Sequence, residues 1–169
     1  KLENGAMKLL LGIAEKEATD LILFNGKSVF ESRQLESEYP QYKNLYMRRN
    51  LYPNIYKGTE LFNLMVISGD YKVSPCLQLI KRSLLKDNNV SFMEGIIYED
   101  NIFSLQCILN AKRVKYLPNV LFIRRVREAS TMTSGAGINN FTSYLSCLNS
   151  VMCSVVQNQK DYSFEVRCT

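Results

Sequence analysis

The feature that most constrains the fold is a short, almost uninterrupted apolar run, Asp20 to Asn25 (DLILFN), which ends at an Asn-Gly pair. A run of this length bounded by a turn signal predicts a strand buried on both faces of a sheet. The preceding residues, 5–18, carry apolar side chains at helical spacing: Leu9, Leu10, Ile13 and Ala14. A helix followed by a buried strand is the rhythm of α/β proteins, so we expect an α/β fold.

The next segment, residues 26–57, has weak periodicity, and we expect it to leave the core as a surface excursion or a β-hairpin. Its second part is rich in aromatic and basic side chains: Tyr39, Tyr42, Tyr46, Arg48, Arg49, Tyr52 and Tyr56. Two interpretations fit this composition. The segment is either an aromatic and basic surface for an acceptor or a partner, or a plain folded-over hairpin.

Apolar spacing predicts four further helices, at 58–67, 75–86, 99–112 and 141–156, and two further strands, at 114–117 and 120–126. Pro75 suits the first turn of its helix. No repeat, low-complexity tract or linker divides the sequence, so residues 1–169 are predicted to form a single domain. Residues 157–169 are predicted to be a loosely ordered tail.

The residue types that are missing exclude several kinds of chemistry. The sequence contains no histidine, which rules out Ser-His-Asp and Cys-His catalysis within this chain. A general base here must therefore be a carboxylate or a lysine. The five cysteines include no CxxC pair, so we expect no metal site in this chain and interpret the thiols as buried in a reducing cytoplasm.

The formal net charge of +5 is modest. It fits binding of an anionic small molecule, or loose attraction to an anionic membrane surface. The basic residues form no dense stripe, so nucleic acid is not expected as a partner. These features predict a cytoplasmic protein, with the inner face of the membrane as an alternative location.

An acidic pair, Glu99 and Asp100, stands at the front of the helix predicted at 99–112. Carboxylates in a first helical turn are stabilised by the unpaired N–H groups and the helix dipole. The same position can hold a carboxylate in a fixed direction at a cleft. The pair is therefore either a helix-start feature or part of a catalytic site.

A resemblance to a known family covers roughly residues 5–135. Residues 94–133 (EGIIYEDNIFSLQCILNAKRVKYLPNVLFIRRVREASTMT) resemble the C-terminal catalytic region of bacterial family 2 glycosyltransferases, nearest to those that assemble capsular and other surface polysaccharides. The upstream segments DLILFNG and VSPCLQLIKRSLL also look like family positions. The resemblance implies a GT-A fold, which is a Rossmann-like α/β sandwich. We expect a partial GT-A fold that lacks the N-terminal nucleotide-binding half.

The resemblance also implies roles for individual residues. Asp100 matches the general base that acts on the acceptor hydroxyl. Glu94, Gly95 and Tyr98 precede this base and are expected to line the acceptor pocket, and Glu99 is expected to position the helix start. A packing role is an equal alternative for Tyr98. Arg125 and Arg127, with Ser130 in the following turn, match positions near the donor diphosphate; the alternative is a solvated cationic face.

The expected activity is inverting transfer of a sugar from a nucleotide-diphosphate donor to a saccharide or lipid-linked acceptor. In the family, an Asp-x-Asp motif holds a divalent metal, Mg or Mn, on the donor; this chain lacks the motif, so by itself it is expected to be inactive and to bind no metal. The alternative is a non-catalytic module that binds a glycan or a partner. An exposed sheet edge or apolar face is also expected, covered by self-association or by residues 26–57.

Overall fold

The structure, a computed structural model, describes residues 1–128 and 138–157. Its centre is a four-stranded sheet in the order β2-β4-β1-β3. The two long strands, β1 (Leu21–Phe30) and β4 (Val114–Val126), run parallel, while the short strands β2 (Ile55–Tyr56) and β3 (Gln78–Ile80) are antiparallel at the edges. The mixed α/β fold predicted from the sequence is confirmed.

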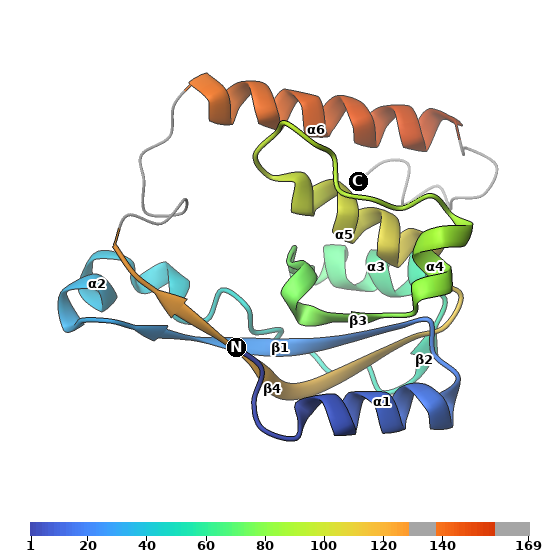
Figure 1. Ribbon diagram of the computed structural model, residues 1–169, viewed down its shortest axis with the longest axis horizontal. Coiled ribbons are helices and arrows are strands. Elements are labelled where there is room, and N and C mark those ends of the chain that lie inside the picture. Colours follow the sequence, from blue (N-terminus) through green and yellow to red (C-terminus); the bar gives the residue numbers. More distant parts are fainter. Residues whose placement is uncertain (129–137, 158–169) are drawn as a thin grey trace.

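Helices cover both faces of this sheet (Figure 1). Helix α1 (Ala6–Glu17) packs on one face, where Ala6 and Leu10 meet Ile22 and Phe24 of β1. Helices α3 (Gly58–Ile67) and α5 (Glu99–Asn110) pack on the other, around Leu21 and Leu23. Residues 21–24 are at most 2% exposed, as expected of a strand covered on both sides.

The helix predicted at 75–86 is wrong in its first half. Pro75–Leu77 form one 3-10 turn (η2), Gln78–Ile80 form β3, and only then does α4 (Arg82–Asp87) begin. The edge of β1 accounts for the difference, because Ile80, Leu79 and Gln78 pair with its residues Leu21, Ile22 and Leu23. This long-range pairing overrides a local helical preference.

The two strands predicted at 114–117 and 120–126 are one strand, β4. It passes through Pro118 with shifts in its register against β1 around Asn25. Such an irregularity lets a strand continue past a proline that cannot donate to the ladder.

Residues 26–57 form no hairpin. The segment begins with the end of β1, continues into α2 (Arg33–Glu38) and the 3-10 turn η1 (Pro40–Tyr42), and ends in β2, which pairs with β4. A buried carboxylate anchors its later part. Asp70 is 0% exposed and accepts hydrogen bonds from the backbone N–H groups of Arg49 and Asn50 at 2.7–3.1 Å.

The last helix, α6 (Ile138–Gln157), lies over α5 as an outer layer (Figure 1). Within the described residues, no helix is long and apolar enough to span a membrane. Ser130 and residues 158–169 lie outside the described part of the chain.

Candidate functional site

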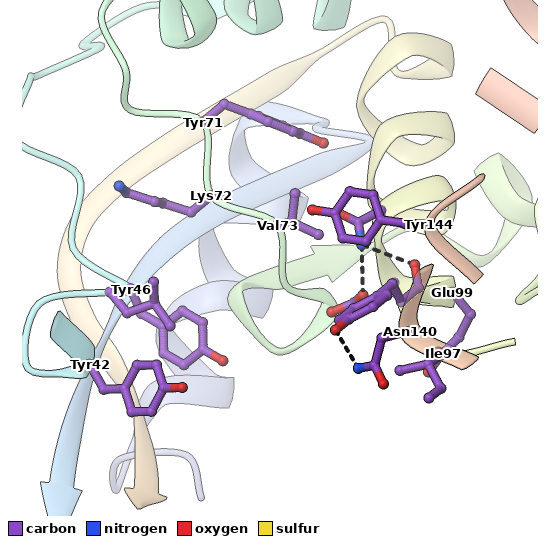
Figure 2. A pocket seen from close by; sticks show the side chains of 13 residues that line it. Tyr42, Tyr46, Tyr71, Lys72, Val73, Ile97, Glu99, Asn140 and Tyr144 are labelled. Atoms are coloured by element: carbon purple, nitrogen blue, oxygen red, sulfur yellow. Dashed lines mark hydrogen bonds between the residues drawn. The ribbon is translucent and has the colours of Figure 1, made fainter. Parts of the chain in front are cut away.

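A cavity of about 790 Å³ opens beside the first turn of α5. Figure 2 shows Tyr42 and Tyr46 on one side of it and Glu99, Asn140 and Tyr144 on the other. Residues from four segments line it: Tyr42, Leu45, Tyr46, Tyr71, Lys72, Val73, Ile97, Tyr98, Glu99, Asp100, Asn101, Asn140 and Tyr144. The lining combines aromatic rings with carboxylates, as ligand pockets commonly combine apolar walls with a few polar groups.

The backbone at the start of α5 is unusual. Tyr98, the residue that precedes the helix, has a φ of 69°, in the left-handed region that side chains other than glycine rarely adopt. Its carbonyl oxygen accepts hydrogen bonds from the N–H of Asn101 at 3.0 Å and from the Sγ of Cys147 at 3.4 Å. Strain of this kind persists where surrounding contacts hold it and concentrates at functional sites.

Helix α6 supplies several of those contacts. Nδ2 of Asn140 donates to the Tyr98 hydroxyl at 2.8 Å, and the N–H of Ile97 donates to Oγ of Ser143 at 3.1 Å. The ring of Tyr144 meets the ring of Tyr98 edge to face, with centroids 5.0 Å apart. The direction in which α5 begins is therefore fixed from outside the helix.

Asp100 lies in this first turn, half-buried at the cavity. Burial raises the pKa of its carboxyl above the ordinary aspartate value, and the neighbouring charge of Glu99 raises it further. The backbone N–H groups of Asp100 and Asn101 act in the opposite direction but do not cancel the rise. A carboxylate with a raised pKa is a stronger proton acceptor than an ordinary surface aspartate.

The opposite wall comes from residues 42–46. The hydroxyl of Ser28 donates to the carbonyl of Tyr42 at 2.7 Å, and the N–H of Gly26 donates to the carbonyl of Tyr46 at 3.0 Å. These bonds attach the wall to the second half of β1, from the buried Gly26 to the partly exposed Ser28.

A cationic side chain packs against the aromatic rings of this wall. The guanidinium of Arg124 lies over the rings of Tyr42 and Tyr46, 4.9 and 5.5 Å from their centroids. Burial raises the pKa of the Tyr46 hydroxyl, Arg124 lowers it and Asp100 raises it. Tyr46 is therefore within electrostatic reach of both a cation and the candidate base.

The structure brings some of the predicted site residues together and separates others. Tyr98, Glu99 and Asp100 line the cavity, whereas Glu94 and Gly95 belong to the preceding loop and are not part of the lining.

Of the residues that were predicted to contact a diphosphate, Arg125 and Arg127 do not line the cavity. Arg124 and Arg125 are neighbours on β4, so their side chains project from opposite faces of the sheet. Nε of Arg125 lies 3.4 Å from Oε1 of Glu31. Arg127 follows the end of β4, and Ser130 is outside the described residues. The prediction that Arg125, Arg127 and Ser130 contact a diphosphate stays a prediction.

Several lining residues were not singled out as site residues from the sequence: Tyr71, Lys72, Asn140 and Tyr144. The hydroxyl of Tyr71 is buried and has no hydrogen-bond partner among the described residues. The tyrosine-rich composition of residues 38–56 was a usable signal for Tyr42 and Tyr46. No comparable signal marks Asn140 and Tyr144, because α6 reaches the cavity only through tertiary packing.

The described residues do not fit the divalent metal that the resemblance implies. No three histidine, cysteine, aspartate or glutamate side chains gather within residues 1–128 and 138–157 in an arrangement that could hold an ion. Glu99 and Asp100 offer only two adjacent carboxylates on one helix, fewer ligands than a protein metal site ordinarily needs.

Comparison with solved structures shows that this chain shares part of a known mixed α/β fold. The similar structures are those of TarS from S. aureus. TarS 1-349 in complex with UDP-GlcNAc has a TM-score of 0.59 and 19% sequence identity, over 90% of this chain and 40% of that one. TarS 1-349 without a named ligand has a TM-score of 0.53 and 21% identity, over 73% of this chain and 32% of that one. This chain thus spans well under half of TarS 1-349.

The sequence matches no protein-family model. It also matches no curated protein sequence. At 19–22% identity, the likeness to TarS establishes the fold alone, because one fold can carry many activities.

Proposed function

We propose that this chain is the acceptor-side part of an inverting family 2 glycosyltransferase, in which Asp100 is the general base. The complete enzyme would transfer a sugar from a nucleotide-diphosphate donor to a saccharide or lipid-linked acceptor during synthesis of a surface polysaccharide. The observation that carries this proposal is Asp100 itself. It is a half-buried carboxylate with a raised pKa, at a rigidly held helix start, facing a tyrosine-lined cavity.

In the proposed step, the Asp100 carboxylate accepts the proton of an acceptor hydroxyl as that oxygen attacks the anomeric carbon of the donor sugar. The new C–O bond forms while the bond to the diphosphate breaks, and the diphosphate leaves with the electron pair. A sugar hydroxyl is a poor nucleophile, and a positioned base contributes about 10²–10⁴-fold to such a step.

The aromatic lining supports a saccharide acceptor. Tyr42, Tyr46, Tyr98 and Tyr144 present rings to the same cavity as Asp100. A pyranose ring has apolar C–H faces and polar edges, so aromatic faces and carboxylates together suit it better than either alone.

The proposed donor is supported by the shared fold. TarS, whose fold this chain shares in part, was solved with UDP-GlcNAc and with UDP, which supports a nucleotide-sugar donor. We propose that Arg125, Arg127 and Ser130 act on the diphosphate side, whereas Arg124, on the other face of β4, supports the tyrosine wall. The buried free thiols Cys107 and Cys147 support a reducing, cytoplasmic setting.

The test is turnover of the complete enzyme with Asp100→Asn and Glu99→Gln. Asp100→Asn keeps the size of the side chain and removes the proton acceptor, so turnover should fall by about 10²-fold or more while donor binding persists. Glu99→Gln should cost far less, because this residue only modulates the electrostatics of Asp100. Near-normal turnover of Asp100→Asn, or greater damage from Glu99→Gln, would overturn the assignment of the base.

A second candidate function is a non-catalytic module that binds a glycan, which the tyrosine-lined cavity also supports. Transfer by the unmodified protein, measured together with saccharide binding, separates the two. In a binding module, saccharide affinity falls when Tyr46 or Tyr144 is changed to alanine, and no transfer is detected even with Asp100 intact.

A further inference from the structure

Helix α6 carries a stripe of exposed apolar side chains on the face turned away from the molecule. Hereafter called the α6 stripe, it consists of Ile138, Phe141, Leu145, Leu148 and Met152. Their exposed fractions are 75%, 62%, 49%, 55% and 57%. Exposure of a contiguous apolar patch of this kind marks a surface that another molecule covers.

The opposite face of α6 packs against the rest of the chain. Ser143 and Cys147 are buried, and they contact the backbone of Ile97 and Tyr98. Figure 1 shows α6 as the outermost element above α5, with its far side free of the described chain. The stripe is therefore not required for packing within the described part of this copy.

The spacing of the stripe specifies the shape of its partner. The five residues are separated by three, four, three and four positions, which is the alternation that faces a second helix along its whole length. Helices packed in this way cross at about 20°, with side chains of each entering gaps on the other.

The charge of the helix specifies the partner further. None of the 20 residues of α6 is aspartate, glutamate, lysine or arginine. Helices that lie on a lipid surface usually carry lysine or arginine on the polar face, which α6 lacks. A neutral stripe meets its own copy across a two-fold axis without bringing like charges together.

We propose that the α6 stripe is the interface of a homodimer, in which α6 of one copy packs against α6 of a second. This inference does not rest on the proposed enzymatic function. It does connect with the cavity, because Asn140 and Tyr144 on the flank of the same helix hold Tyr98 at the start of α5. Pairing of the two α6 helices thus braces the wall that carries Asp100.

The experiment is analytical ultracentrifugation of the chain over a range of concentrations, with Leu145→Glu/Leu148→Glu as the disrupting variant. Both leucines are about half exposed in the monomer, so charges there should leave the fold intact. In the dimer they are buried, and we expect the dissociation constant to rise by about 100-fold or more. Circular dichroism checks that the helix content of the variant is unchanged.

The control is Ile67→Glu, which adds a single negative charge, as Phe141→Glu does, at a side chain that is 77% exposed at the end of α3. The control should dimerise like the unmodified chain. Phe141→Glu is a second disrupting variant, for use if the double variant does not fold. A chain that stays monomeric at every concentration, or a dimer that survives these charges, would overturn the proposal. So would a monomer that binds anionic vesicles through the stripe, since that result would make lipid the partner.

Discussion

Nδ2 of Asn140 lies 2.8 Å from the hydroxyl of Tyr98, so a residue of α6 restrains the left-handed residue that opens α5, 42 positions earlier in the chain. The bond links two elements that approach each other only in the folded protein. Asp100 is two residues beyond Tyr98, and its direction is therefore set by α6 as well as by its own helix.

Tyr98→Phe should destabilise the protein modestly. The substitution removes the hydrogen bond from Asn140 and keeps the ring contact with Tyr144, so we expect a loss of about 0.5–1.5 kcal/mol. Tyr144→Phe is the matched control, because the Tyr144 hydroxyl has no partner among the residues described. Denaturant melts of the two variants provide the measurement, and equal stabilities would show that the Asn140 bond contributes nothing.

The pH dependence of turnover in the complete enzyme should respond to Glu99. A general base works only when ionised, so the rate falls as the pH drops below the pKa of Asp100. Burial raises that pKa most, and Glu99 raises it next. Glu99→Gln removes one of these causes, so the acid limb of the pH profile should move to lower pH. Asp87→Asn, at the exposed end of α4, controls for a general loss of negative charge, and an unmoved limb in Glu99→Gln would count against Asp100 as the base.

Asp70→Asn should be strongly destabilising. The buried carboxylate accepts from two backbone N–H groups, from Nδ2 of Asn50 and from the hydroxyl of Tyr52, and an amide nitrogen placed there would face donors. We expect a loss of about 3–5 kcal/mol, the range found when a buried charged network is broken.

The same carboxylate gives the stability of the protein a pH dependence. Burial alone would raise the pKa of Asp70, but the hydrogen bonds from Arg49, Asn50 and Tyr52 outweigh it and lower the pKa. A lowered carboxyl pKa contributes stability that is fully present above the unfolded-state pKa and is lost as the pH falls through the folded-state value. Urea melts between neutral and acid pH should show this loss in the unmodified chain and a flatter profile in Asp70→Asn.

Gly58→Ala should disrupt the contact between α3 and α5. A Cβ at this position would overlap the carbonyl oxygen of Ile108 and lie 2.8 Å from that of Ala111, both of them backbone atoms. Gly12→Ala is the control, because that glycine lies in α1 with nothing within 4 Å of the added Cβ. We expect Gly12→Ala to stabilise the protein by about 0.5–1 kcal/mol, and Gly58→Ala to lower the melting temperature. Similar melting temperatures for the two variants would contradict the close packing at Gly58.

Elements with strong local patterns were predictable. The helices expected at 5–18 and 99–112 are observed as Ala6–Glu17 and Glu99–Asn110, and the strand expected at 20–25 is observed as the first half of Leu21–Phe30. In each case the apolar spacing directly determines which side chains are buried. Strand β3 was missed because only its pairing with β1, more than 50 residues away in the sequence, makes Gln78–Ile80 extended.

The position of only one wall of the cavity was predictable, although the composition of residues 38–56 indicated the tyrosines of the other wall. Glu99 and Asp100 indicated the α5 wall, because two carboxylates at the start of a predicted helix are typical of a helix start or of a catalytic site. The position of the facing wall depends on hydrogen bonds from Ser28 and Gly26 to the backbone carbonyls of Tyr42 and Tyr46. Every residue has such a carbonyl, so the sequence does not show which ones are bonded. The positions of Asn140 and Tyr144 likewise follow from the packing of α6 on α5.

The two walls of the cavity differ in how they are attached to the core, and therefore in how much substitution each tolerates. Helix α5 is locked into the core, where the N–H of Gly58 donates to the carbonyl of Ala111 just past the helix end. Residues 42–46 belong to a surface segment that is fastened to β1 mainly through main-chain atoms, which persist whatever side chains the segment carries. Substitution in that segment therefore changes the shape of the cavity without disturbing the core or the first turn of α5, which carries Asp100.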